Sequence, residues 1–190
     1  GYGSAMKENL AGIEDYTRIG SLLQPEQIVK YGELTLRENQ IAYAEPSFFR
    51  LFDFELLKGD KKTCLSMPGQ VVITERIASK YFKDEDPIGK IFIFTGAYDK
   101  ISCEVTGVMK EMPSNSHIHY SFLISYKSLP KYMQEYWYKH EAYTYVLLDS
   151  PERKAEIERE FPVMAEKYKT DEALKNKTWG VSLIPLADIH

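Results

Sequence analysis

The spacing of apolar residues along the chain changes between a helical and a strand-like period. Met6, Leu10 and Ile13 recur at helical intervals, and Gly12 lies where such a helix would stop. Over residues 101–108, apolar and polar side chains alternate instead, which is typical of a strand with one wet face. The same reasoning predicts strands at 16–23, 28–31, 33–43, 70–73, 91–94, 119–125, 143–148 and 180–186, and helices at 46–52, 75–82, 132–138, 152–168 and 171–176.

Local signals refine two of these helices. Thr74 directly precedes an apolar helical face, where its hydroxyl can cap the first turn. Pro162 lies inside the segment 152–168 and predicts a kink or a break there. Strands and helices are mixed without a regular strand–helix–strand alternation, so the pattern predicts an α+β architecture.

Composition and charge exclude several classes of protein. The chain has 190 residues, 44% of them apolar, and a net charge of −4 with scattered basic residues, which does not fit a nucleic-acid-binding stripe. Its apolar runs reach about four residues, whereas a membrane-spanning helix needs about 20. No signal peptide precedes the first predicted helix, and the sequence starts with Gly rather than Met. We therefore expect a piece of a longer protein.

Candidate chemistry is sparse. Common phosphate-, dinucleotide- and metal-binding motifs and the nucleophile-elbow motif are absent from the sequence. His117 and His119 would share one face of a strand, but a zinc site needs one or two further ligands, so exposed side chains at a strand entry are the favoured interpretation. Cys64 and Cys103 are expected to be free thiols, although a disulfide is possible in an oxidising compartment. No cofactor is expected.

Two aromatic groups have competing interpretations. Phe48, Phe49, Phe52 and Phe54 are expected to pack as core under a short helix, the alternative being a ligand pocket. The second group surrounds Trp137 and is denser in aromatic residues than a core requires. Within it we select a candidate contact surface formed by Tyr132, Tyr136 and Trp137.

Four pairs of loop and strand segments follow one another along the chain. They are YAEPSFFRLFDF (43–54) with LKGD (57–60), VVIT (71–74) with DPIGK (86–90), VTGV (105–108) with PSNSH (113–117), and YTYVLL (143–148) with PLADIH (185–190). Taken in this order, the segments resemble the MacB-like periplasmic core domain of FtsX-like ABC transporter permeases, as found in Bacteroidetes bacteria. Residues 1–42 resemble this family less closely.

Four positions in these segments are candidate fold and turn positions rather than chemical ones. Gly59, Gly89 and Gly107 permit tight turns or close backbone approach. Pro87 fixes a turn before the strand that follows. None of the four supplies a nucleophile or a metal ligand, so they are expected to specify the fold.

The resemblance implies a two-lobed α+β periplasmic core domain. Residues 1–44 and 116–190 would form a porter-like mixed α/β lobe, and residues 45–115 a second α+β lobe inserted into it. The chain termini would lie together at one end, and the turn at 86–89 at the far end. Such a domain faces the periplasm as part of a permease in the inner (cytoplasmic) membrane.

The implied function is non-enzymatic. The domain would couple the cycle of a cytoplasmic ABC ATPase to an extracytoplasmic substrate or partner, which is called mechanotransmission. Implied partners are the permease's own transmembrane helices, the ATPase subunit, a second permease copy and an unknown periplasmic protein, with no nucleic acid among them. The alternative is a periplasmic sensor that binds a ligand or peptide in the aromatic cluster.

Overall fold

The computed structural model describes residues 1–21, 26–96, 100–135, 137, 142–169 and 175–189. Within this part of the chain, ten strands form one mixed sheet, in the order β10-β1-β4-β9-β6-β8-β7-β2-β3, with β5 paired to β8. The elements are α1 (Tyr2–Asn9), β1 (Ile13–Gly20), β2 (Glu26–Tyr31), β3 (Leu34–Asn39), β4 (Ile41–Ala44), α2 (Phe48–Leu51), β5 (Leu56–Lys58), β6 (Gln70–Thr74), α3 (Glu75–Phe82), β7 (Ile91–Thr95), β8 (Lys100–Met109), β9 (Phe122–Ser125), η1 (Tyr126–Ser128), α4 (Lys131–Gln134), β10 (Tyr143–Leu148), α5 (Arg153–Glu166) and η2 (Leu186–Asp188).

The inner strands β4, β6 and β9 are buried on both faces. We call the strands from β2 to β9, with α2, α3, η1 and α4, the central lobe. In β6, Val71 and Ile73 face the apolar cluster beneath α3, whereas Val72 faces the cluster beneath α2. Thr74 caps α3 as predicted, because its hydroxyl accepts a hydrogen bond from the Ile77 N–H. Because successive side chains of a strand point to opposite faces, β6 contributes to the apolar cores on both faces of the sheet.

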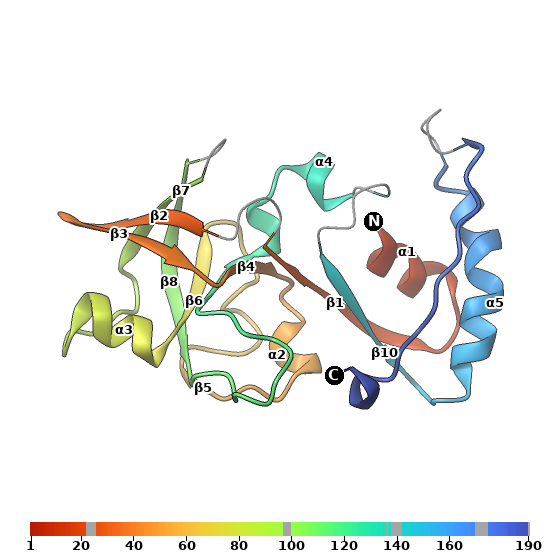
Figure 1. The fold of residues 1–190 in the computed structure, drawn as a ribbon, viewed down its shortest axis with the longest axis horizontal. Coiled ribbons are helices and arrows are strands. Elements are labelled where there is room, and N and C mark those ends of the chain that lie inside the picture. The colour runs from red at the N-terminus through yellow and green to blue at the C-terminus, as the bar shows by residue number, and fades with distance from the viewer. Residues whose placement is uncertain (22–25, 97–99, 136, 138–141, 170–174, 190) are drawn as a thin grey trace.

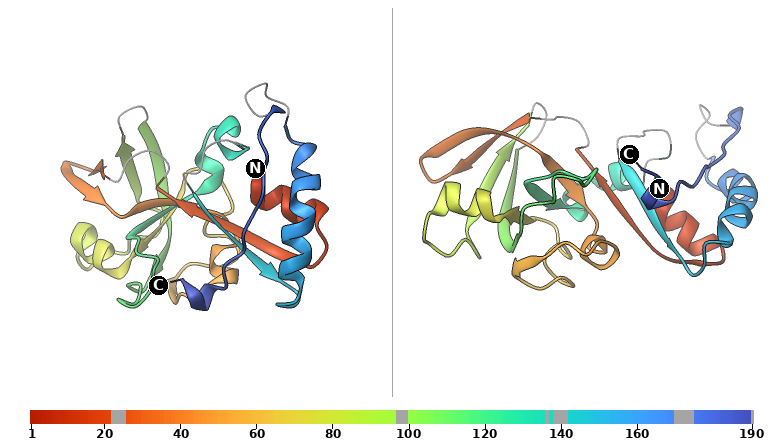
Figure 2. Two further views of the ribbon diagram at one scale, coloured as in Figure 1. Left: turned by 45° about the vertical axis from the view of Figure 1, so that its right-hand side comes forward. Right: turned by 60° about the horizontal axis from the view of Figure 1, so that its bottom comes forward.

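A second unit, the terminal lobe, is built on β1 and β10 at the other end of the sheet. It comprises these strands with α1, α5 and residues 175–189. Met6 from α1, Phe161 from α5 and Trp137 meet in its core. Figures 1 and 2 show α1 and α5 next to β1 and β10, with α3 and the β2–β3 hairpin at the opposite end. Gly1 and η2 both lie in the half that holds the terminal lobe.

The structure corrects several predicted boundaries. The strand expected at 33–43 is two strands, β3 and β4, because Gln40 adopts a φ of 57° and interrupts the extended backbone between them. The helix expected at 132–138 is shorter, with α4 ending at Gln134, and the first helix, expected to stop at Gly12, ends at Asn9. Most of the helix expected at 171–176 lies outside the described residues. Pro162 does not break α5, which runs from Arg153 to Glu166.

The predicted strand at 180–186 is wrong. These residues join no ladder, and the segment passes into the short helix η2. Val181 and Leu183 instead pack against the core of the terminal lobe. The alternating pattern therefore reports burial of one face of this segment rather than pairing with β10.

The predicted three-part division of the chain stays a prediction. In the structure, β2 comes from the segment 1–44 and pairs with β7, which comes from 45–115. Strands from both predicted lobes thus share one continuous sheet. The two lobes named here are defined by their packing, with β1 belonging to both.

The two cysteines are free and buried on opposite faces of the sheet, Cys64 in the cluster near α2 and Cys103 in the cluster near α3. This placement excludes the disulfide that the sequence left open. Burial raises the pKa of each thiol to about 12. Over the described part of the chain, no helix is both long and apolar enough to cross a membrane.

Candidate functional site

The junction between the two lobes is the site at which buried polar groups gather. β1 pairs with β10 from Ile13 to Ile19, and its last residues pair with β4, where Ile19 lies opposite Ala44. A single strand therefore belongs to both lobes. Its side chains Asp15 and Arg18 are both largely buried, although charged groups are seldom buried unless they are paired.

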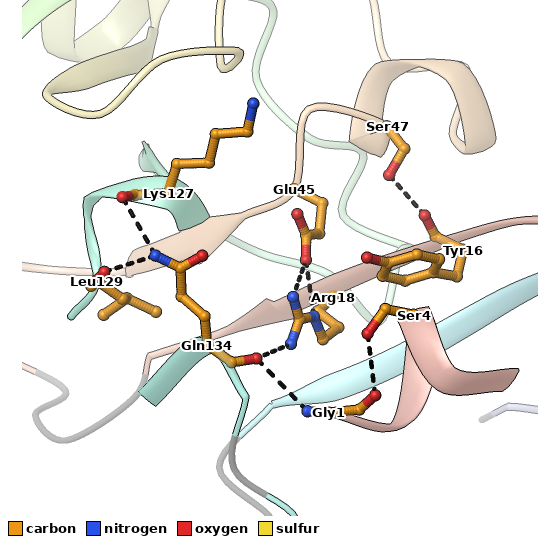
Figure 3. A network of polar contacts seen from close by, with 9 residues as sticks. All are labelled: Gly1, Ser4, Tyr16, Arg18, Glu45, Ser47, Lys127, Leu129 and Gln134. Carbon is orange, nitrogen blue, oxygen red and sulfur yellow. Dashed lines mark hydrogen bonds and ion pairs between the residues drawn. The ribbon is translucent and has the colours of Figure 1, made fainter. Parts of the chain in front are cut away.

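Arg18 holds the centre of this junction (Figure 3). Its Nε donates to Glu45 Oε1 at 2.7 Å, and its Nη2 forms an ion pair with the same oxygen. Glu45 directly follows β4, and its own N–H donates to the Arg18 carbonyl at 3.1 Å. The side chain and the backbone therefore tie β1 to the end of β4 by charge-assisted and neutral hydrogen bonds together.

The remaining donors of Arg18 reach a third element. Nη1 donates to the carbonyl oxygen of Gln134 in α4 at 2.5 Å. The guanidinium carbon lies 4.1 Å from the ring centroid of Tyr126 in η1, a cation–π contact in a desolvated site. Gln134 in turn donates from Nε2 to the carbonyl of Leu129 at 2.7 Å. Arg18 thus joins β1, β4 and the η1–α4 segment through one side chain.

The chain start also meets this network. The Gly1 nitrogen donates to the same Gln134 carbonyl at 3.5 Å, and Ser4 Oγ donates to the Gly1 carbonyl at 3.1 Å (Figure 3). Burial, with the nearby charge of Arg18 as the second cause, lowers the pKa of the Gly1 amine from 8.0 to about 5.

A second set of contacts forms around Asp15, three residues before Arg18 on β1. Asp15 on β1 accepts a hydrogen bond from Lys7 Nζ of α1 at 2.8 Å and forms an ion pair with Arg50 of α2. Burial alone would favour the neutral carboxyl, but the hydrogen bonds from Lys7 and Arg50 hold the pKa of Asp15 below its usual value. Ser47 Oγ also donates to the Tyr16 carbonyl at 2.6 Å. β1 is therefore tied to helices of both lobes.

The predicted glycine positions lie away from this junction. Gly59 has a φ of 96°, and a Cβ built on it would lie 2.4 Å from the Thr106 carbonyl oxygen. A Cβ on Gly107 would meet Val72 at 3.1 Å, so the backbones approach closely where β5 pairs with β8. Gly89 has a φ of 80° with open space around it, and Pro87 beside it is buried. Their role in specifying the fold stays a prediction.

The residues of the predicted contact surface differ in exposure. Tyr132 is 60% exposed, whereas Trp137 is 9% exposed. Trp137 is stacked between Tyr168 and Trp179, at 4.5 Å and 5.3 Å between ring centroids, so its indole is core of the terminal lobe rather than exposed surface. Tyr136 lies outside the described residues. A contact surface at this place stays a prediction that rests on Tyr132.

The other candidates are also placed. The described residues contain no group of three or more His, Cys, Asp or Glu side chains that could hold a metal. His117 and His119 are both exposed, and His117 Nε2 shares a 2.9 Å hydrogen bond with the Tyr145 hydroxyl. Phe48, Phe49 and Phe52 are 0%, 3% and 9% exposed, which confirms the prediction of a packed core.

Sequence reasoning missed Arg18 and Glu45. They are separated by 27 positions, and no local motif connects them. The available signal was weak: Arg18 lies inside an otherwise buried strand, and Glu45 precedes Pro46 at the end of another. Their proximity depends on the pairing of β1 with β4.

Comparisons with known proteins agree on one family. A family model described as the MacB-like periplasmic core domain matches residues 2–162. A domain assigned to a permease from Porphyromonas gingivalis superposes with a TM-score of 0.76 at 22% identity, covering 91% of this chain and 72% of that one. No match was found among curated proteins.

Two further solved structures share the fold. The periplasmic region of MacB from Actinobacillus actinomycetemcomitans has a TM-score of 0.62 at 17% identity, over 87% of this chain and 72% of that one. The extracellular domain of YknZ, a noncanonic ABC-type transporter from Gram-positive bacteria, has a TM-score of 0.57 at 17% identity, over 90% of this chain and 85% of that one. At these identities the likeness shows the fold.

Proposed function

Because this chain belongs to the MacB-like periplasmic core domain family, we propose that it transmits motion from the membrane part of its permease to an extracytoplasmic substrate or partner. The chain is the periplasmic domain of a MacB- or FtsX-like ABC transporter permease, as the sequence resemblance predicted. The family implies a membrane-spanning permease that works with an ABC ATPase. In our proposal the domain itself catalyses no reaction.

One observation carries this proposal: β1 pairs in both lobes and bears the buried Arg18–Glu45 ion pair where it crosses between them. A part that transmits motion needs a stiff connection between its ends. A continuous strand fixed on two sides by hydrogen bonds and ion pairs supplies one, whereas a flexible linker would not. Burial keeps the ion pair largely unscreened by salt.

The proposed setting has three further parts. The permease would lie in the inner membrane, with this domain in the periplasm. A second permease copy would stand beside the first, and a periplasmic protein or substrate would contact the far end of the central lobe, near α3 and the turn at 84–89 (Figure 1). Acidic residues in that turn are exposed and pair with lysines, for example Glu85 with Lys90 at 2.9 Å, so the turn offers a charged, hydrated surface.

The test uses the full-length permease with its ATPase, reconstituted in lipid. Nitroxide labels are placed at Met67 in the central lobe and Val163 in α5, which are 59% and 73% exposed, while the buried Cys64 and Cys103 stay unlabelled. Between nucleotide-free and ATP-bound states, we expect the distance from Met67 to a relaxation agent on the lipid headgroups to change. The distance between Met67 and Val163 should stay in one narrow distribution.

Junction variants complete this test. Arg18→Gln is expected to broaden the Met67–Val163 distribution and weaken the response of Met67 to ATP. Arg37→Gln removes the exposed pair with Glu26, whose side chains are 70% and 51% exposed, and serves as the matched control without an effect. A Met67 position that ignores the nucleotide would contradict the proposal, and so would equal broadening by both variants.

A further inference from the structure

Within the described residues, the part of the sheet formed by β3, β2, β7 and β8 is covered on one side only. Val29, Phe92 and Cys103 point to the side that holds α3 and are 0% exposed in the apolar cluster there (Figure 1). The neighbours of these residues along each strand point to the opposite face. On that face Ile28 and Ile91 are 44% and 48% exposed, and we call it the open face.

Three isoleucines form an apolar stripe across the open face. Ile28 of β2 lies opposite Thr95 of β7. Ile93 and Ile91 share the face of Thr95 on β7, at intervals of two residues. Ile28 is thus a diagonal neighbour of Ile93, which lies next to Ile91. A continuous exposed stripe, in contrast to single apolar residues, is typical of a surface that another protein surface covers.

Two charged residues on β8 border this stripe. Lys100 lies opposite Thr95 and Glu104 opposite Ile91, with Ser102 midway between them on the same face. Four residues of strand separate the two charged residues by about 13 Å. Both side chains are exposed, and neither forms an ion pair within the described part of the chain. The open face therefore carries unpaired opposite charges at equal distances from Ser102.

This arrangement is self-complementary for two copies of the chain that pack face to face. A two-fold axis that lies between the copies, perpendicular to the strands and level with Ser102, brings Lys100 of each copy over Glu104 of the other. Ile93 lies opposite Ser102, so the two isoleucine stripes meet at the axis. A two-fold axis along the strands would not bring Lys100 and Glu104 together, because it reverses the order of the strands and leaves the residues along each strand at the same height.

The position of the lobes selects the same axis. The order of the strands runs from β3 in the central lobe to β10 in the terminal lobe, and an axis perpendicular to the strands preserves this order in both copies. The two terminal lobes then lie at the same end of the pair. The proposed setting needs this geometry, because both permease copies lie in one membrane and the far ends of both central lobes point away from it.

We propose that the open face is the contact between the periplasmic domains of two permease copies, which pack sheet on sheet across this axis. Lys100 of each copy pairs with Glu104 of the other, and the two isoleucine stripes form the apolar centre, with the sheets about 10 Å apart. Lys30, opposite Ile93, faces its own counterpart near the axis, and this repulsion weakens the contact. The inference rests on the second permease copy of the proposed function and assigns a surface to it.

The test uses the full-length permease in lipid, because a face of four strands is small for a stable dimer and a shared membrane raises the effective concentration of the two copies. Ser102→Cys places a thiol at the axis. The control is Val163→Cys on α5, at a side chain 73% exposed. A short bismaleimide should link Ser102→Cys permeases into covalent dimers and leave Val163→Cys permeases as single chains. Cys64 and Cys103 are buried and stay unlabelled.

Charge reversal separates this contact from chance encounters in the membrane. Lys100→Glu and Glu104→Lys should each lower the yield of Ser102→Cys dimers at least about 5-fold, because each places like charges across the axis. The two reversals together should restore the yield, since they exchange the charges and recreate both pairs. Lys62→Glu, at an exposed lysine in the loop before β6, makes the same change in net charge and is the matched control without an effect.

Three results would overturn the proposal. They are a double variant that stays as low as the single ones, an equal loss of dimers with Lys62→Glu, and no dimer of Ser102→Cys in either nucleotide-free or ATP-bound permease. Cross-linking of Ser102→Cys to a different protein would assign the open face to that protein instead. The proposed transmission of motion is measured separately at Met67. Charge-dependent dimers with a Met67 position that ignores ATP would contradict the transmission and leave this contact in place.

Discussion

Arg18 and Glu45 form an ion pair whose side chains are 9% and 11% exposed, at the place where β1 passes from the terminal lobe to the central lobe. We expect Arg18→Met to destabilise the domain by about 3–5 kcal/mol, because it leaves the Glu45 carboxylate buried without its partner. The double variant Arg18→Met/Glu45→Leu should recover much of this loss, since it removes both charges. Urea unfolding of the three proteins measures the difference.

The control for this prediction is the exposed pair Arg37–Glu26. Arg37→Met should change the free energy of unfolding by less than about 1 kcal/mol, because both partners are solvated. If Arg18→Met were no worse than Arg37→Met, the junction would contribute little to stability.

Packing beneath α2 gives a second prediction. Phe48 is 0% exposed and stacks on Phe54 at 5.5 Å between ring centroids. Phe48→Ala should cost about 3–5 kcal/mol, from lost burial and the cavity left behind. Leu57→Ala, at a side chain 45% exposed, is the comparison and should cost less than about 1 kcal/mol. Thermal unfolding measures the effect of both substitutions. Equal melting temperatures for the two variants would contradict the assigned packing.

Two glycines with positive φ should respond differently to alanine. Gly59→Ala combines an unfavourable φ of 96° with a contact of 2.4 Å to the Thr106 carbonyl, so we expect a loss of about 2–4 kcal/mol. Gly89→Ala meets nothing within 4 Å at a φ of 80° and should lose about 1 kcal/mol from the backbone strain alone. Denaturant midpoints at constant m-value measure both. The reverse ranking would show that contact with Thr106 is relieved at little cost.

The Gly1 amine predicts a pH dependence of stability for the chain that starts at this residue. Its pKa is about 5 when folded, against 8.0 for the ordinary group, so between these values the unfolded chain binds a proton that the folded chain lacks. Stability should therefore rise with pH across this window. Acidification from pH 8 to pH 5 is expected to cost on the order of 2 kcal/mol, after allowance for partial solvent exposure.

Acetylation of the Gly1 amine supplies the matched control, because it removes the titrating group and leaves the rest unchanged. All other titratable groups are the same in both proteins, so the difference between the two stability curves isolates the amine. Parallel curves would contradict the assigned burial of Gly1.

Local sequence signals found the elements whose pattern depends on near neighbours. Thr74 and the apolar face that follows it define α3, and the run Tyr143–Leu148 coincides with β10. Local signals failed where the conformation of a segment depends on the strands beside it. Gln40 gives no local warning of its positive φ, and residues 180–186 have the pattern of a strand without a strand beside them.

The candidate site could not be predicted from local sequence signals either, because it too depends on strand pairing. Arg18 and Glu45 meet because Ile19 lies opposite Ala44 in the β1–β4 pair, and that register is a property of the assembled sheet. The family resemblance predicted the fold class, but it named turn positions such as Gly59 and Gly89 rather than the charged residues of the junction. A search for charged residues inside predicted strands would have selected Arg18.

The continuity of β1 has a mechanical consequence. Along this strand no loop intervenes between the two lobes, since its pairing with β10 passes directly into its pairing with β4. A rotation of one lobe against the other would therefore have to change the twist of the sheet, a quantity that varies by roughly 10–35° between neighbouring strands of natural sheets. Such a deformation is elastic, so a torque applied at one end of the strand is stored as a change of twist and then released. A free hinge between the lobes would not store it.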